Sequence, residues 1–188
     1  MEILKMRLPT CAEYSLLVEA TSGDDNIILW KNMCFWCWDT CPDCASHRAV
    51  RGYRSAHFWY DDAAAARHAH IGFRPAFEIQ NPDALGSNKV VTVGTLYMDG
   101  RPVRVPEKPV LNGDIWSYVP GSKLELRPAL DDPAYQVRAI KAGNTLIADR
   151  TLLKYASWND IQMALDNEGR SYLVLNWKNF IFQKSPKS

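Results

Sequence analysis

Alternating apolar and polar residues over the first eight positions predict a strand, because successive side chains of a strand point to opposite faces. Thr10 and Glu13 have the three-residue spacing of a capping box, and they predict a short helix over 11–19. A polar cluster over 21–26 predicts a turn. The rest of the first half is rich in aromatic residues and has little periodicity, which indicates an irregular region.

The second half of the chain has the alternation and the β-branched residues that are typical of strands. Two glycine-containing pairs, Asp99-Gly100 and Gly143-Asn144, predict hairpins within it. We expect strands over 90–98, 101–105, 135–140, 145–148 and 172–182, and a helix over 158–165 that is capped by Ser157.

A polar segment over 80–89, rich in Asn, Pro, Gly and Ser, predicts a loop or linker, so we place a domain boundary near residue 86. The two sides differ in charge: 8 basic and 11 acidic residues give residues 1–86 a net charge of −3, whereas 14 basic and 10 acidic residues give residues 87–188 a net charge of +4. All five cysteines and all four histidines lie on the first side.

Composition narrows the class of protein. The chain has 188 residues, of which 47% are hydrophobic and 23% charged, and this balance excludes a disordered chain. No apolar run reaches the roughly 18 residues of a membrane span. Charges at Glu2, Lys5 and Arg7 argue against a signal peptide, so we predict a cytoplasmic protein that does not bind membranes. The net charge of +1 argues against a chain that coats nucleic acid.

Five short motifs occur in order along residues 7–78. They are 7–14 (RLPTCAEY), 32–39 (NMCFWCWD), 48–52 (RAVRG), 54–56 (RSA) and 66–74 (ARHAHIGFR). Together they resemble the formylglycine-generating enzyme family, also called sulfatase-modifying-factor-like. The resemblance implies that residues 1–86 form an irregular, C-type-lectin-like α+β unit. The pattern of residues 87–188 adds a small antiparallel β-rich domain with one helix.

The chain departs from this family where the family's enzymes do their chemistry. Those enzymes use two cysteines, with copper, between the R-G-G and G-F-R segments, and this chain has no cysteine after Cys44. Phe35 stands where calcium-binding members have a glutamate, and it supplies no oxygen ligand. The resemblance therefore implies a member without a cofactor, closer to the family's ligand-display and receptor-binding proteins than to its enzymes.

Four cysteines lie within eleven residues, at Cys34, Cys37, Cys41 and Cys44. Two C-x2-C pairs are typical of a zinc site, although three residues between the pairs are few for a zinc fold. In a continuous helix the outer cysteines would lie about 15 Å apart, so only a turn at Pro42 would bring the pairs together. The alternatives are buried structural thiols and a redox pair of Cys41 and Cys44.

The histidines of the first half are further candidates. His68 and His70 alternate, so they face the same side of a strand, and His47 and His57 lie nearby in the sequence. They predict either a metal or general-base site or ordinary exposed polar positions.

Four residues are expected to be structural: Arg51, Arg74, Trp36 and Trp38. The resemblance implies that the two arginines hold the fold through buried ion pairs and contacts with backbone carbonyls, and Asp61 and Asp62 are the expected ion-pair partners. The tryptophans belong to the aromatic core that it implies.

Basic residues of the second half are interleaved with aromatic residues, at Lys89, Arg101, Arg104, Lys108, Lys123, Arg127, Arg138, Lys141, Arg150 and Lys154. This mixture fits a nucleic-acid-binding face as well as an ordinary solvated sheet.

These observations lead to a non-catalytic protein that binds a macromolecule, with a protein as the expected partner and nucleic acid as the alternative. Exposed aromatic residues are the expected contacts, at Trp59, Tyr60, Trp116 and Tyr118. By analogy with accessory proteins of phages and mobile elements, we hypothesise an inhibitor of a host defence system such as a CRISPR nuclease. The enzymatic alternative is a degenerate metal-dependent oxidase or a thiol redox enzyme.

Overall fold

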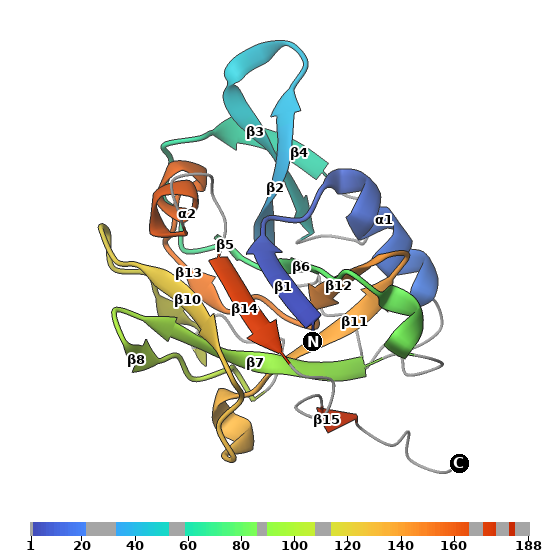
Figure 1. Cartoon of the computed structure of the whole chain (residues 1–188). Helices are drawn as coiled ribbons and strands as arrows, with labels where there is room; N and C mark the ends of the chain where they lie inside the picture. The colour runs from blue at the N-terminus through green and yellow to red at the C-terminus, as the bar shows by residue number, and fades with distance from the viewer. Residues whose placement is uncertain are drawn as a thin grey trace.

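The computed structural model in Figure 1 describes residues 2–21, 33–52, 59–85, 90–107, 114–165, 171–175 and 181–182. These residues form two β-sheets and two α-helices, a β-rich α+β fold. The α+β class predicted from the sequence is therefore confirmed.

The larger sheet is antiparallel and curls into a half-barrel, with the strand order β10-β7-β11-β12-β6-β1-β14; β8 and β15 also pair with β7. Its strands are β1 (Glu2–Arg7), β6 (Ala76–Glu78), β7 (Val90–Met98), β8 (Arg101–Pro102), β10 (Leu124–Arg127), β11 (Val137–Ala142), β12 (Thr145–Ala148), β14 (Ser171–Leu175) and β15 (Ile181–Phe182). The strands at the two ends of this order, β10 and β14, contact each other, so the sheet wraps around its inner face (Figure 1).

The smaller sheet is mixed and has the order β4-β3-β2-β5-β13-β9. Its strands are β2 (Cys34–Cys41), β3 (Cys44–Gly52), β4 (Trp59–Ala63), β5 (Ile71–Phe73), β9 (Trp116–Ser117) and β13 (Leu153–Lys154). The β2–β5 and β13–β9 pairs are parallel, and the others are antiparallel. The tip of the β2–β3 hairpin projects from the body of the molecule (Figure 1).

The helices begin where the sequence predicts. Helix α1 (Cys11–Ala20) follows a capping box in which the Thr10 side chain accepts from the Glu13 backbone N–H and the Glu13 carboxylate accepts from that of Thr10. Helix α2 (Trp158–Ala164) has the same arrangement at Ser157 and Asp160. Two short 3-10 helices are η1 (Pro82–Leu85) and η3 (Pro133–Tyr135). Within the described residues, no helix has the length and apolar character that crossing a membrane requires.

Both predicted hairpins are also confirmed. Asp99 and Gly100 join β7 to β8 with φ angles of 49° and 76°, the positive values that a type I′ turn needs. Gly143, with φ of 62°, begins the turn between β11 and β12. Of the turn predicted over 21–26 only residue 21 is described, and of the final strand the structure describes β14 and β15.

The expectation of an irregular region between the first helix and the middle of the chain is wrong for its described part. The strands β2, β3 and β4 form an antiparallel meander there. The β2–β3 pairing shifts register twice, so the two-residue alternation that marks a strand is interrupted. Phe35, Trp36 and Cys37 are all buried, because both faces of β2 are covered, and this removes the remaining alternation.

Strands from before and after residue 86 pair within both sheets. In the larger sheet β6 pairs with β12 and β1 pairs with β14, and in the smaller sheet β5 pairs with β13. Among the described residues the predicted domain boundary therefore does not separate the two sheets.

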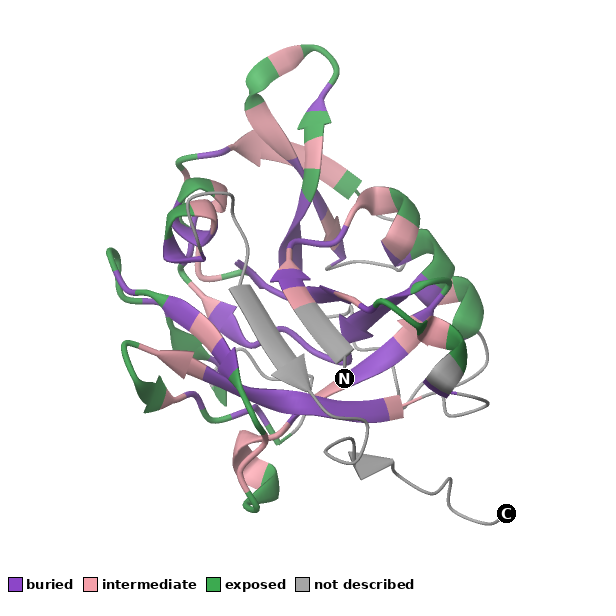
Figure 2. Ribbon diagram, in the orientation of Figure 1, coloured by how far each residue is buried: buried purple, intermediate pink, exposed green. Residues whose placement is uncertain are grey.

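The main core joins the two sheets. Trp36 and Phe73 of the smaller sheet pack in one cluster with Phe77, Leu126 and Leu146 of the larger sheet. Figure 2 shows this buried interior and the more exposed tip of the β2–β3 hairpin. A second cluster lies beneath α1, which packs against β2, β11 and β12.

Gly72 allows β5 to approach β13 and the residues just before it. A Cβ atom at this position would lie 2.3 Å from the carbonyl oxygen of Leu153 and 2.4 Å from Cγ2 of Thr151. Any larger residue would force these segments apart. This close approach gives a physical reason for the glycine in the IGFR motif.

Candidate functional site

The 64–70 loop places His68 between Asp62 on β4 and Tyr155, which lies just after β13. Asp62 on β4 lies with Oδ2 3.1 Å from Nε2 of His68, and the ring centroids of His68 and His70 are 5.1 Å apart. The backbone N–H of Tyr155, just after β13, donates to the carbonyl of His68 over 3.3 Å. These contacts join β4, the 64–70 loop and the end of β13.

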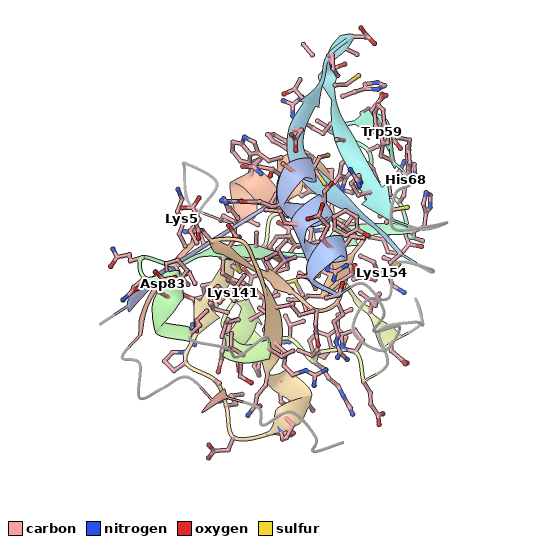
Figure 3. The ribbon with its side chains drawn as sticks, turned by 90° about the vertical axis from the view of Figure 1, so that its right-hand side faces the viewer. Lys5, Trp59, His68, Asp83, Lys141 and Lys154 are labelled. Carbon is pink, nitrogen blue, oxygen red and sulfur yellow. The ribbon has the colours of Figure 1, made fainter. Side chains whose placement is uncertain are left out.

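Residues of β13 and β9, at the other end of the sheet from β4, are grouped with these side chains. Lys154 Nζ lies 6.0 Å from the ring centroid of Tyr155. The β13–β9 register pairs Trp116 with Leu153 and Ser117 with Lys154, so Trp116 and Lys154 lie on opposite faces of the sheet. Tyr60 shares a face of β4 with Asp62 because side chains alternate along a strand. We call this set the aromatic–histidine surface; it consists of Tyr60, Asp62, His68, His70, Trp116, Lys154 and Tyr155. In Figure 3, His68 and Lys154 lie along one side of the molecule, whereas Lys5 and Asp83 lie on the other.

Backbone and ion-pair contacts hold the 64–70 loop in place. Arg67 donates from Nε and Nη2 to the two carboxylate oxygens of Asp160, at 2.6 and 2.8 Å, and this ties the loop to the start of α2. The loop carbonyl of His70 accepts from the Cys34 N–H at 2.8 Å. The histidines are therefore carried on a loop that is fixed at both ends.

Tyr155 combines exposure with backbone strain. Its φ angle is 57°, in the left-handed region, although it has a bulky side chain. Such a conformation costs a non-glycine residue roughly 1–2 kcal/mol. The residue is nevertheless 44% exposed, so a large part of its surface contributes no packing to offset that cost. Strain of this kind is concentrated at functional positions.

A second histidine–aspartate pair lies on the other face of β4. Nδ1 of His47 on β3 lies 2.5 Å from Oδ1 of Asp61. Trp59 alternates onto this same face and is the most exposed tryptophan among the described residues.

The two histidine environments shift pKa values in opposite directions. The hydrogen bond with Asp61 raises the pKa of His47, because the carboxylate stabilises the protonated ring. Burial, followed by the nearby His68, lowers the pKa of His70.

We therefore expect His47 to titrate above 6.5 and His70 below it in ¹H NMR spectra of the imidazole protons. The His47 pair stabilises the fold fully below its unfolded pKa, and this contribution disappears as the pH rises through the higher folded pKa. His70 has the opposite effect. Because its folded pKa is lower than its unfolded pKa, the fold loses stability as the pH falls through the unfolded pKa. The variant Asp61→Asn is the control and should lower the pKa of His47 alone. A His70 that titrates at or above His47 would contradict the assignment.

The four predicted contact residues have different environments. Tyr60 and Trp116 belong to the aromatic–histidine surface; Trp116 is 40% exposed, whereas Tyr60 is half-buried and packs against the main core. Trp59 is exposed but lies on the opposite face of β4. Tyr118 is a correction: it is only 4% exposed, and its hydroxyl donates to the carbonyl of Ser122 at 2.8 Å. Tyr118 is a core residue, because its ring packs into the main cluster instead of facing solvent.

The four clustered cysteines do not converge on one point. Cys34 packs in the main core and Cys37 in the cluster beneath α1, so their side chains lie on opposite faces of β2. Cys41 and Cys44 lie at the hairpin tip. Among the residues that the structure describes, no group of three or more His, Cys, Asp or Glu side chains is arranged to hold a metal. The predicted four-cysteine zinc site is therefore not formed, because β2 is extended and divides its cysteines between two faces.

Burial also argues against a chemical role for the Cys34 thiol. The thiol is fully buried beside Tyr60, and burial raises its pKa to about 11. It is therefore protonated at neutral pH and unsuited to act as a nucleophile.

The structural residues predicted from the sequence lie within or beside the core, and Arg74 makes the expected contact with a backbone carbonyl. Arg74 is buried and donates from Nε to the carbonyl of Ala148 at 2.7 Å, with its guanidinium 5.2 Å from the Phe35 ring. The guanidinium of Arg51 lies 5.0 Å from the Tyr14 ring. The expected partners, Asp61 and Asp62, pair with histidines instead.

The two tryptophans differ. Trp36 is fully buried, and its Nε1 donates to the carbonyl of Ala156 at 2.8 Å. Trp38 is exposed and its ring lies 5.7 Å from that of Trp158.

A buried arginine–aspartate cluster that the sequence did not predict lies at the larger sheet. Asp149 accepts from Nε and Nη2 of Arg150 at 2.8 and 2.9 Å, and Arg138 Nη2 lies 2.8 Å from its Oδ2. The Nη1 of Arg150 donates to the carbonyls of Pro106 and Glu107. The cluster borders a hollow of about 420 Å³ and joins the 105–107 segment to β11 and the end of β12.

Some sequence candidates lie outside the described residues. They are His57, the 54–56 motif, Lys89 and Lys108.

No family model, no curated protein and no solved structure matches this chain. The resemblance of residues 7–78 to the formylglycine-generating enzyme family stays a prediction.

The sequence pattern marks Tyr155 only as one of the aromatic residues that are interleaved with the basic residues of the second half. Its position one residue after a two-residue strand gives no periodicity signal, and its left-handed backbone is set by tertiary contacts. The sequence signals that pointed to this surface were the alternation of His68 and His70 and the aromatic residues Tyr60 and Trp116.

Proposed function

We propose that this protein is a non-catalytic binding protein that contacts a protein partner through the aromatic–histidine surface. The proposal rests on the observation that Tyr155, an exposed aromatic residue beside His68, is held in a strained backbone conformation. A glycine would remove the strain, and 44% of the tyrosine surface is exposed to solvent and not packed, so a role outside folding explains why a tyrosine is present.

The composition of the surface favours a protein over a nucleic acid. Aromatic side chains are the usual anchors of protein interfaces, and Tyr60, Trp116 and Tyr155 provide them here. The aromatic–histidine surface contains one lysine, Lys154, and no arginine. A surface that binds phosphates uses several basic residues. The Asp62 carboxylate would further disfavour a phosphate backbone.

The test compares Tyr155→Gly with wild type in capture from an extract of the source cells. We expect Tyr155→Gly to melt close to wild type, because relief of the left-handed backbone strain offsets the loss of the half-buried ring, and to lose a protein that wild type retains. The matched control is Tyr97→Ala, which removes a tyrosine from β7 of the larger sheet and should retain the partner.

Retention of the same proteins by Tyr155→Gly would overturn the proposal. Captured material that is lost on nuclease treatment, with a steep dependence on salt, would favour the nucleic-acid alternative. Identification of the retained protein also tests the hypothesis of an inhibitor of a host defence system.

A further inference from the structure

The tip of the β2–β3 hairpin carries a pair of cysteines that the proposed function does not use. Cys41 ends β2 and Cys44 begins β3, separated by the two-residue turn Pro42-Asp43. They lie directly opposite each other in the strand pairing, and both are free thiols in this structure. Opposed residues of antiparallel strands have Cα atoms about 4.5–5.5 Å apart, within the range of about 4.4–6.8 Å that a disulfide requires.

The two thiols have unequal environments. Cys44 is partly exposed, and its Sγ lies 3.2 Å from Oγ of Ser46. Hydrogen bonding from Ser46, with a smaller effect of His47, lowers the pKa of Cys44. Cys41 is only 9% exposed. One accessible thiol beside one shielded thiol is the arrangement of an attacking and a resolving cysteine.

The backbone around Cys44 is held in place. The strand pairing shifts between Thr40 and Cys41, and residues 45–47 form the extra length on β3. Nη1 of Arg48 donates to the carbonyls of Ala45 and His47 at 2.7 and 2.9 Å, and its guanidinium lies 4.3 Å from the Trp158 ring. This bulge keeps Ser46 next to the Cys44 sulfur.

We propose that Cys41 and Cys44 form a thiol–disulfide exchange site that reduces disulfides of small molecules or proteins at the exposed hairpin tip. The Cys44 thiolate attacks one sulfur of a disulfide RSSR, which forms the mixed disulfide Cys44–S–S–R and releases RS⁻. Cys41 loses its proton to solvent and attacks the Cys44 sulfur, which forms the Cys41–Cys44 disulfide and releases the second RS⁻. Two electrons pass from the cysteine pair to RSSR, and the two thiolates take up two protons.

A thiol count after incubation with glutathione disulfide tests the site. The number of free thiols in wild type should fall from five to three, as measured in denaturant after removal of glutathione. The variant Cys41→Ser should stop at one glutathione adduct, visible by mass spectrometry, because the resolving thiol is missing. The variant Cys44→Ser should keep its four thiols over the same period.

A second thiol pair provides the internal control. Cys11, at the start of α1, is hydrogen-bonded to Cys37 and is the rival site of oxidation. Cys11→Ser should still lose two thiols, whereas Cys41→Ser/Cys44→Ser should lose none. A wild type that keeps five thiols, or a double variant that still loses two, would overturn the proposal.

Discussion

Replacing Asp149 by alanine is expected to lower the free energy of unfolding by about 3–5 kcal/mol, the usual cost of breaking a buried ion pair. The carboxylate accepts hydrogen bonds from Arg150, whose side chain is 7% exposed, and pairs with Arg138. Without Asp149, the Arg150 charge stays buried with only carbonyl partners. Thermal unfolding followed by circular dichroism should show a melting temperature lower by roughly 6–20 °C.

A double variant separates the charge effect from lost packing. In Asp149→Ala/Arg150→Met the uncompensated charge is removed, so the protein should be more stable than Asp149→Ala alone. Asp83→Ala, which removes an exposed carboxylate from η1, should change the melting temperature little. If the double variant is less stable than Asp149→Ala, the buried charge is not the cause of the loss.

Replacing Trp36 by alanine is expected to lower the free energy of unfolding by about 3–5 kcal/mol, because it leaves a large cavity between the two sheets. Trp36 is fully buried and its Nε1 bond to Ala156 connects β2 to the segment that precedes α2. Urea unfolding followed by circular dichroism measures the change as a lower midpoint at an unchanged slope.

Trp38 is the matched control for Trp36. It lies two residues further along β2 but is exposed, so Trp38→Ala should lower the free energy of unfolding by less than about 1 kcal/mol. Trp36→Phe keeps most of the ring volume and should isolate the hydrogen bond, at about 1 kcal/mol. Equal losses in Trp36→Ala and Trp38→Ala would contradict the placement of Trp36 in the core.

Sequence pattern predicted the elements whose signals are local. The capping boxes at Thr10 and Ser157 depend on residues three positions apart, and Asp99-Gly100 depends on two neighbouring φ angles. Such signals identify where an element begins or turns. They say nothing about which strands pair, because pairing depends on contacts between distant residues.

The β2–β3–β4 meander shows why the aromatic region was misjudged. Periodicity identifies a strand only when one face is buried and the register is regular. Here β2 is covered on both faces and its pairing with β3 shifts register. The metal prediction failed for the same reason, since extended β2 sends Cys34 and Cys37 to different clusters.

The sequence by itself determined an α+β chain, both helices, two hairpin turns and the closely spaced Cys41 and Cys44. Only the tertiary structure decided that strands from both halves share each sheet, that Tyr118 is buried and that Asp149 is the carboxylate of the buried cluster. It also brought Tyr155 beside His68, 87 positions earlier in the chain. The physical reason is that turns and caps depend on the conformation of adjacent residues, whereas burial and ion pairing depend on which distant surfaces meet.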